Sequence, residues 1–395
     1  VKASFERIVW PPKGVVSQRQ LYFDAVAKIE TPDDYTVKFT LSRPQASFPA
    51  IVSVPFNGIF PKALLDKKPD MKKDIMGSGP FRFKEYIRGV QFVVEKNPDY
   101  FIPGRPYLDG VVRYIIPDPA AAKGAFISGR LDLLHLNLPY TEAELGEMKK
   151  QVPGMVVPKA VGFALFAFIP NVTRKPWNDL RVRRAVMLAL DKDALLEHHK
   201  PGQGVRGGYM PPGPWAIPNE DLLKLPGWGK TTAKDLVEAK QLLAEAGYPK
   251  GFTASHAARN IREYVDQGVS FQGMLAKVGI TLELDIMENA AWQVIRRTPN
   301  FETMGSGAVS VEMGEPDIIL SRYLSGSTGN YSQYKNPRID ELYREQSQAM
   351  DPAERVKKVL EVQRIMIEDL PFMPWAWQGY EAIHSARVKN YSLPG

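Results

Sequence analysis

The residues in this chain whose type and spacing suggest chemistry include two carboxylates three positions apart, Glu312 and Glu315. A pair of Asp or Glu side chains is the machinery of glycoside hydrolysis, but no other motif of a sugar site accompanies them. The chain has no Gly-x-Ser-x-Gly nucleophile elbow. Gly77-Ser78-Gly79 lacks the Lys-Ser/Thr pair of a phosphate-binding loop, so we interpret it as a turn. We therefore predict that the protein is not an enzyme, and a secreted hydrolase is the least favoured alternative.

The histidines give no metal site. They stand at positions 135, 198, 199, 256 and 384, and none belongs to a His-x-x-x-His or Glu-x-x-His arrangement. Adjacent residues of a helix point to different faces, so His198 and His199 are not expected to share an ion. A catalytic zinc usually has three protein ligands. The sequence predicts no metal and no cofactor.

The overall composition indicates a globular protein with more than one lobe. At 395 residues the chain exceeds the usual capacity of one hydrophobic core. The formal net charge is +7, but Lys and Arg are scattered and form no basic stripe of the kind that binds nucleic acid. No apolar run approaches the roughly 18–20 residues that span a bilayer. The absence of cysteine is compatible with an oxidising, extracytoplasmic space. The chain starts at Val1 without a signal segment, and we interpret it as a fragment or processed form.

Helix and strand patterns alternate along the chain. Residues 25–41 predict a hairpin, because Tyr35, Val37, Phe39 and Leu41 alternate with polar residues. Further strands are predicted at 81–86, 91–96, 111–116, 131–134, 161–170, 280–287, 371–377 and 380–386. Helices are predicted at 118–128, 181–190, 191–198, 232–246, 261–278, 290–297 and 351–369, the last opened by a capping box from Asp351 to Glu354. A Gly/Pro-rich loop covers 201–218 and is long enough to be functional. This alternation predicts α/β lobes with mixed sheets.

Several motifs occur together in a fixed order. They are the turn Gly77-Ser78-Gly79-Pro80, the run Asn97-Pro98-Asp99-Tyr100, and the long signature from Asn171 to Ala185, NVTRKPWNDLRVRRA. Further motifs of the same series lie at 106–109, 239–249 and 371–377. In this order the motifs resemble the large extracytoplasmic solute-binding proteins of ABC importers, family 5, which capture peptides, nickel chelates, opines and related solutes. The resemblance covers nearly the whole chain.

The resemblance implies an α/β fold of the periplasmic-binding-protein type II kind, with two main lobes joined by a hinge and a smaller peripheral lobe. It places a partial peripheral lobe at 1–76, the first main lobe at 77–170 and 371–395, and the second main lobe at 171–370. The chain crosses between the main lobes near Asn171 and near Pro371. The resemblance also implies that an N-terminal part of the family fold is missing from this chain.

For the solute site, the resemblance indicates the segment from Glu312 to Asp317. In peptide-binding members an acidic residue three positions before the Glu/Asp-Pro unit receives the α-ammonium of the peptide, and Glu312 stands there, followed by Met313. A buried ammonium needs such a counter-charge. Two departures are notable: Val309 stands where many members have Trp, and residues 304–307 replace a basic position. Aromatic residues beside the return crossing could cover a solute, and these are Trp375, Trp377 and Tyr380.

The function that the resemblance implies is reversible capture of a solute, above all a peptide, between two lobes, and its delivery to an ABC permease in the membrane. The protein would be a monomer in the periplasm or another extracytoplasmic space, without a nucleic-acid partner. A nickel chelate, an opine or an oligosaccharide is the alternative solute within the family. A chaperone-like interaction protein is the alternative from another class.

Overall fold

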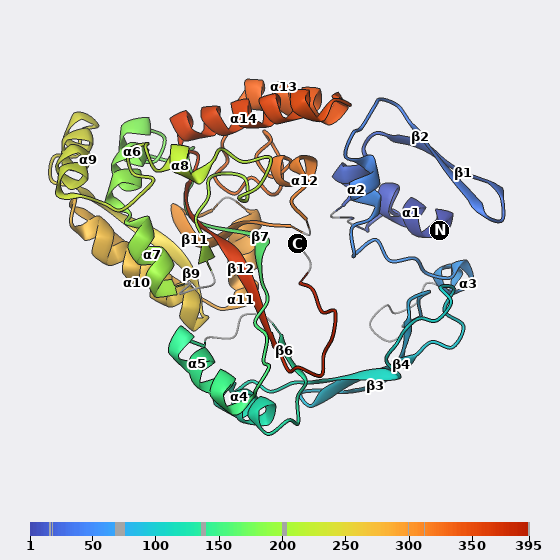
Figure 1. Ribbon diagram of the computed structural model, residues 1–395. Coiled ribbons are helices and arrows are strands. Elements are labelled where there is room, and N and C mark those ends of the chain that lie inside the picture. Colours follow the sequence, from blue (N-terminus) through green and yellow to red (C-terminus); the bar gives the residue numbers. More distant parts are fainter. Residues whose placement is uncertain are drawn as a thin grey trace. The chain divides into compact units, whose positions relative to one another are not determined.

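The fold is seen in a computed structural model that describes residues 1–15, 17, 19–67, 76–135, 140–199, 204–298, 300–311 and 313–393 (Figure 1). The chain divides into two compact units, Val1–Leu134 and His135–Gly395. Strand β6 (Leu133–His135) spans the point of division. Each unit is described by itself.

The first unit contains short helices and two antiparallel sheets. Its helices are α1 (Lys2–Val9), the 3-10 turn η1 (Gln20–Phe23), α2 (Phe48–Val52), α3 (Lys62–Asp66) and α4 (Pro119–Ile127). One sheet is the hairpin β1 (Val26–Asp33) and β2 (Thr36–Leu41), and the other contains β3 (Phe81–Ile87), β4 (Gln91–Lys96) and β5 (Gly110–Tyr114) in that order. Four rings from separate elements pack edge-on around its small core: Phe5, Phe23, Phe39 and Phe48.

The predicted hairpin and helix 118–128 form in this unit, with one local exception at Tyr35. The strands predicted at 111–116 and 131–134 are shorter or shifted, at Gly110–Tyr114 and Leu133–His135. The hairpin forms, and Val37, Phe39 and Leu41 are half-buried between exposed neighbours as the period-2 pattern requires. Tyr35 was placed in the same stripe, but it lies in the turn and is 98% exposed. Asp118 caps α4 as expected, because its Oδ1 accepts the N–H of Ala121 at 2.7 Å.

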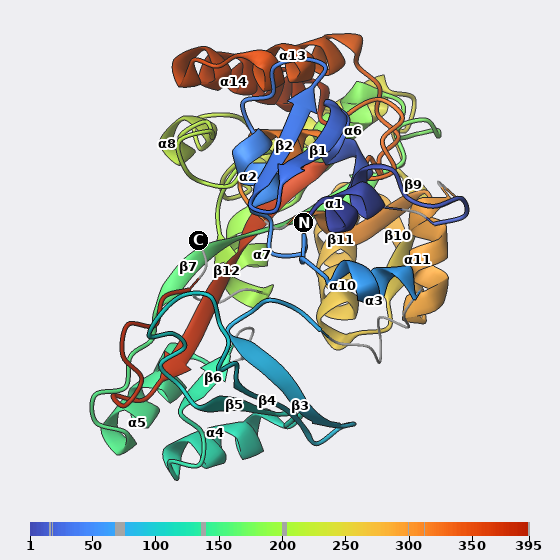
Figure 2. The same ribbon diagram turned by 90° about the vertical axis from the view of Figure 1, so that its right-hand side faces the viewer.

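The second unit is built on a mixed sheet with helices around it (Figure 2). Its strands are β7 (Lys159–Pro170), β8 (Gly204–Val205), β9 (Phe252–Arg259), β10 (Ile280–Met287), β11 (Thr303–Ser310) and β12 (Met373–His384). Its helices are α5 (Glu142–Gln151), α6 (Leu180–Ala189), α7 (Lys192–His199), α8 (Asn219–Leu222), α9 (Ala233–Glu245), α10 (Arg262–Ala276), α11 (Asn289–Arg297), α12 (Pro316–Leu320), α13 (Pro337–Gln348) and α14 (Pro352–Asp369). This is the α/β architecture that the alternating pattern predicts.

The strand order in this unit is β10-β9-β11-β7-β12, with β8 also paired to β12. Strands β10, β9 and β11 are parallel, whereas β7 is antiparallel to both β11 and β12. The carboxyl ends of the three parallel strands therefore lie at one edge of the sheet. In open α/β sheets that edge is where ligands bind.

One predicted pair of strands is a single strand. Residues 371–377 and 380–386 were expected as two strands, but β12 runs from Met373 to His384 beside β7 (Figure 2). Its pairing with β7 shifts twice, between Pro374 and Ala376 and between Trp377 and Gly379. These irregularities interrupt the alternation of buried and exposed residues, so the sequence looks like two strands.

The signature at 171–185 includes the start of α6, and its Arg183 side chain forms hydrogen bonds with the end of α14. Asp179 caps α6 by accepting the N–H of Arg181 at 2.8 Å. Arg183 is buried, and its guanidinium donates to the carbonyl oxygens of Asp369, Leu370 and Trp177 at 2.8–3.2 Å. Leu370, the C-cap of α14, has a left-handed backbone with φ 46°. The motif thus satisfies the free carbonyl groups at the end of a long helix.

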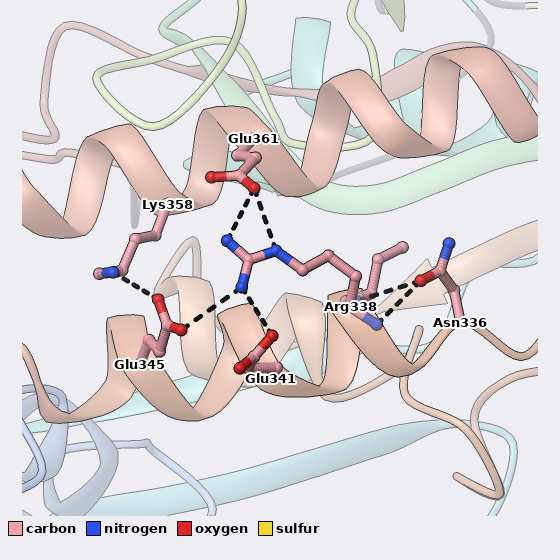
Figure 3. Close-up of polar contacts among 7 residues, drawn as sticks. Asn336, Arg338, Glu341, Glu345, Lys358 and Glu361 are labelled. Atoms are coloured by element: carbon pink, nitrogen blue, oxygen red, sulfur yellow. Dashed lines mark hydrogen bonds and ion pairs between the residues drawn. The ribbon is translucent and has the colours of Figure 1, made fainter.

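Helices α13 and α14 lie side by side and are linked by surface charges (Figure 3). Arg338 contacts Glu341 at 2.6 Å and Glu345 at 3.5 Å on its own helix, and Glu361 on α14 at 2.9 Å. At the start of α14, Asp351 caps the N–H of Ala353 at 2.8 Å. The reciprocal half of the predicted capping box is replaced, in the part of the chain that the structure describes, by a pair between Glu354 and Lys357 at 2.5 Å.

Candidate functional site

The candidate site begins at an irregular stretch of β7. Trp377 of β12 pairs with Leu165, but Gly379, only two residues on, pairs with Val161. Three residues of β7, Gly162 to Ala164, therefore stand opposite one residue of β12. Bulges of this kind redirect side chains and are frequent beside functional sites. On its other edge, β7 pairs with β11 only as far as Ala164, which is the partner of Ser310.

Tyr380 lies against this bulged segment. The backbone of Gly162 is buried under its ring, so that a Cβ at position 162 would come within 2.7 Å of Cζ of Tyr380. The ring itself is half-buried, and burial raises the pKa of its phenol. Of the three predicted aromatic contacts, Tyr380 is the one whose ring remains partly accessible.

The predicted solute loop meets the same segment of β7. The N–H of Val311 donates to the carbonyl of Phe163 at 3.1 Å, and the Phe163 ring packs on Gly314, where a Cβ would lie 2.8 Å from Cε1. Met313, between these two contacts, is half-buried. Glu312 lies outside the described residues. The backbone on both sides of position 312 therefore contacts Phe163. The neighbour of Phe163, Gly162, lies under the Tyr380 ring.

Buried charges anchor the far end of this loop. Arg355 of α14 contacts Glu315 at 2.5 Å and Asp317 at 3.5 Å, and Asp317 also accepts from Gln346 and Ser347 of α13. Burial raises the pKa of Glu315, and the Arg355 guanidinium opposes that rise. Glu315 is therefore committed to an ion pair, and it is not the free second carboxylate that a glycosidase would need.

Trp375 and Trp377 are buried in this conformation. Trp375 is the extra residue in the first irregularity of β12, 1% exposed, with its ring 5.3 Å from that of Phe166. Trp377 is fully buried, and its Nε1 donates to the carbonyl of Gly208 at 2.9 Å. Their role as solute contacts stays a prediction. In the Gly/Pro-rich loop, Tyr209 and Met210 are also fully buried, and the Tyr209 hydroxyl donates to Phe372 O at 2.9 Å.

Sequence reasoning missed a stack of arginine and aromatic side chains at the carboxyl edge of the parallel strands. Two guanidinium groups, Arg259 from the end of β9 and Arg296 from α11, lie over the Trp292 ring at 5.2 and 4.9 Å from its centre. Each also lies over a second ring. The order along the stack is Tyr264, Arg259, Trp292, Arg296 and Tyr331, and we call it the arginine–aromatic stack.

The two arginines of this stack have no carboxylate partner within the described residues. No described side chain or carbonyl accepts a hydrogen bond from either guanidinium, and both Nε atoms are buried without a partner. Burial lowers the pKa of Arg296, and the neighbouring cations Arg297, Arg259 and Arg322 lower it further. Ring faces hold a guanidinium with about 0.5–2 kcal/mol each but do not neutralise it. The stack is thus a pair of oriented cations that can receive an anion.

The sequence did carry a signal for this stack. Trp292, Arg296 and Arg297 sit on a predicted helix, and Arg259 stands beside Asn260 at the start of a loop. Since β9 and β11 were not predicted, the carboxyl edge to which these residues belong could not be drawn. Among the described residues no group of His, Asp and Glu side chains could hold a metal ion.

Residues 1–331 match the family model for bacterial extracellular solute-binding proteins, family 5 (middle region). The chain belongs to this family. It is 28% identical to the oligopeptide-binding protein AppA of Bacillus subtilis over 96% of this chain and 71% of that protein, and 29% identical to heme-binding protein A of Haemophilus influenzae over 93% and 68%.

Solved structures give the same family. A periplasmic binding protein AgaA of A. tumefaciens R10, in complex with agropinic acid, matches with a TM-score of 0.81 at 27% identity, covering 100% of this chain and 79% of that one. The binding protein DppA of Helicobacter pylori, in complex with the peptide STSA, matches with a TM-score of 0.81 at 27% identity, covering 98% and 77%.

Family membership confirms several predictions. The protein is a solute-binding component of an ABC importer with the mixed α/β fold of family 5, and the family is extracellular and not catalytic. Among the described residues no helix combines the length and the apolar character needed to cross a membrane.

Proposed function

We propose that this solute-binding protein captures a peptide, with the ammonium of the peptide at Glu312 and its carboxylate at the arginine–aromatic stack. The observation that carries the proposal is the pair of guanidinium groups without a protein carboxylate, Arg259 and Arg296. A guanidinium presents a planar fork of donors that fits a carboxylate. A solute with a positive and a negative end would satisfy both the acid and the arginines.

The two ends of this site belong to neighbouring parts of one sheet. Arg259 ends β9, and the loop with Glu312 and Met313 follows the end of the adjacent parallel strand β11. Extrapolated from the register Met304–Ala257, Arg259 stands level with Ser306. Ser310, the last residue of β11, is thus about four residues further, or about 13 Å of strand at roughly 3.3 Å per residue. The long arginine side chain shortens the gap, so a short extended peptide suits it.

We also propose the lobes that would close on the solute. The peripheral lobe is 1–76, the first main lobe 77–170 with 371–395, and the second main lobe 171–370. The irregular pairing of β7 with β12 lies just before one crossing and just after the other, where a change of backbone angles costs few ladder hydrogen bonds. Tyr380, Trp375 and Trp377 all lie on that part of β12. A solute favours the closed form only through contacts that are absent in the open form.

The relatives support a peptide, and they also include a heme-binding protein and a complex with an opine. Oligopeptide-binding AppA and the peptide complex of DppA favour a peptide. The complex of AgaA with agropinic acid favours an opine, which also carries carboxylate. Both solutes would use the arginine–aromatic stack, so the role of Glu312 separates them.

Calorimetric titration with tri-alanine tests the proposal. Glu312→Gln keeps the shape of the side chain and removes its charge, and we expect the binding free energy to weaken by about 3–5 kcal/mol, as for a buried ion pair that loses one partner. Arg296→Gln should weaken binding by about 1.5–3 kcal/mol, the usual contribution of a hydrogen bond to a charged group. Arg297→Gln is the matched control, because it removes the same charge from the exposed neighbouring position.

The outcomes separate the solute classes. Tri-alanine binding that Glu312→Gln and Arg296→Gln both weaken, with Arg297→Gln unchanged, supports a peptide. Binding of an opine that ignores Glu312→Gln but is lost in Arg296→Gln would replace the peptide with the alternative. Indifference of every bound solute to Arg296→Gln would remove the stack from the site.

A further inference from the structure

We propose that Gly162 is a specificity-determining residue of the solute site, because the lack of a side chain there lets the Tyr380 ring lie on β7 and leaves space for the solute. The inference rests on the proposed function, since it takes Tyr380 as a solute contact. It concerns the size of the peptide side chain that the site accepts.

Burial along β7 shows how closely the two residues are matched. From Ala160 to Ala164 every residue is half-buried except Gly162, which is buried. The cover comes from the Tyr380 ring, because a Cβ at position 162 would lie 2.7 Å from Cζ and 2.9 Å from Cδ2. Real Cβ atoms do not approach other heavy atoms so closely. Any residue other than glycine at 162 must therefore displace the ring.

The ring has one direction in which it can yield. The backbone is held on both sides of Gly162, because the Phe163 carbonyl accepts the N–H of Val311 at 3.1 Å and Val161 pairs with Gly379, whereas the Tyr380 ring is half-exposed. Alanine at 162 would therefore move the phenol away from β7 and into the accessible space. A displaced ring occupies volume that a solute side chain would otherwise take.

A second contact of the same kind provides an internal control. At Gly207 a Cβ would lie 2.7 Å from Cδ1 of Trp377, so this ring also lies on a glycine. Trp377, however, is fully buried and its N–H is bonded to Gly208 O. Alanine at 207 must disturb the core, while alanine at 162 disturbs an accessible ring. The first should cost stability and the second specificity.

The experiment compares tri-alanine with tri-leucine by calorimetry in the whole chain. We expect Gly162→Ala to lower the ratio of the tri-leucine affinity to the tri-alanine affinity by about tenfold, the scale on which a pocket discriminates small differences in volume. The double variant Gly162→Ala/Tyr380→Ala should match Tyr380→Ala alone, because no ring is left to displace. Gly146→Ala, in helix α5 with no atom within 4 Å of the added Cβ, is the neutral control.

A solute-independent measurement tests the geometry. Burial raises the pKa of Tyr380, so a ring displaced from β7 should titrate closer to the ordinary value for tyrosine. NMR of ring-labelled protein, assigned by comparison with Tyr380→Phe, gives this pKa for the wild type and for Gly162→Ala. A merely structural effect of the substitution would lower the melting temperature without changing the pKa of Tyr380.

Each result has a clear meaning. An unchanged tri-leucine to tri-alanine preference in Gly162→Ala, or an unchanged phenol pKa, overturns the inference. A double variant that binds more weakly than Tyr380→Ala shows that Gly162 does not act through the ring, and this also overturns it. If the wild type binds neither peptide, the proposed peptide function has failed. The pKa of the Tyr380 phenol in the wild type and in Gly162→Ala then still shows whether the ring lies against Gly162.

Discussion

Two arginines of the second unit are held in opposite ways. Arg355 is 7% exposed in its side chain and contacts Glu315, Asp317 and the main-chain and side-chain oxygens of Gln346. Arg296 lies between the rings of Trp292 and Tyr331, at 4.9 and 4.7 Å, with no carboxylate partner within the described residues. The first cation is neutralised by the chain itself, and the second is oriented but not neutralised. The comparison separates a structural arginine from one available to a solute.

The largest effect should come from removing the neutralised cation. Arg355→Ala leaves Glu315 and Asp317 as buried carboxylates without their counter-charge, and we expect the free energy of unfolding to fall by about 3–5 kcal/mol. Urea unfolding followed by circular dichroism measures it. A fall below about 1 kcal/mol, as for an exposed pair, would show that water reaches these carboxylates and would weaken the contrast.

Removing the unneutralised cation should act on binding instead. Arg296→Ala takes away a group that no described carboxylate needs. The unfolding free energy should fall by no more than about 2 kcal/mol, the loss of two ring contacts of a half-exposed arginine at about 0.5–1 kcal/mol each. Affinity for tri-alanine should fall by about 1.5–3 kcal/mol. If Arg296→Ala lowers the free energy of unfolding as much as Arg355→Ala does, the two arginines do not differ in their contribution to stability.

The salt dependence of binding gives a further test of the role of Arg296. Binding of a solute carboxylate to partly exposed guanidinium groups is screened by added salt, so the affinity should fall as NaCl rises from low to near-molar concentration. Arg296→Ala should flatten this dependence, while Arg297→Ala at the exposed neighbouring position should leave most of it in place.

A third buried group avoids charge altogether. His256 is fully buried between Phe168 and Phe271. Its Nδ1 lies 2.9 Å from Thr303 Oγ1, whose proton is donated to Ser255 O. We therefore assign the proton to Nδ1, and Nε2 is left without a partner in the described part of the chain. Burial lowers the pKa of His256 to about 3.

This pKa gives a pH dependence with a definite sign. The unfolded chain takes up a proton at His256 near pH 6.5, and the folded protein does so only near pH 3. Stability is therefore lost as the pH falls through this window, by at most about 1.4 kcal/mol per pH unit from this residue. In His256→Phe the slope between pH 6 and 4 should be smaller. Equal slopes in the two proteins would show that His256 is hydrated or charged in the folded state.

The elements that the sequence predicted have strong local signals, and those it missed do not. Helix α9 was predicted at 232–246 and spans Ala233–Glu245, with Thr232 as its N-cap and Gly247, at φ 92°, just after its C-cap. Strand β11 was missed because Gly305 and Gly307 interrupt any apolar alternation. The structure explains Gly305, since a Cβ there would lie 3.0 Å from Nε2 of His256 and 3.3 Å from Phe271. A glycine required by tertiary packing weakens the local strand pattern.

The candidate site follows the same rule. Tyr380 and the loop with Met313 could be indicated from family motifs, but their meeting at Gly162 and Phe163 depends on the pairing of β7 with β11 and β12. Trp375 and Trp377 are both buried, but for different reasons. The first fills an irregularity of β12, and the second lies under Gly207 and Gly208. Burial of this kind is set by loops distant in the chain, and local pattern does not contain it.

The smallest effect should come from the arginine with the most carboxylates. Arg338 contacts Glu341, Glu345 and Glu361 across α13 and α14, but its side chain is 44% exposed (Figure 3). Exposed pairs contribute about 0.2–1 kcal/mol, because water already solvates both charges and added salt screens them. Arg338→Ala should therefore lower the unfolding free energy by at most about 1 kcal/mol, and high salt should remove most of the difference. A loss as large as that of Arg355→Ala would mean that the number of partners, and not their burial, decides what an arginine contributes in this fold.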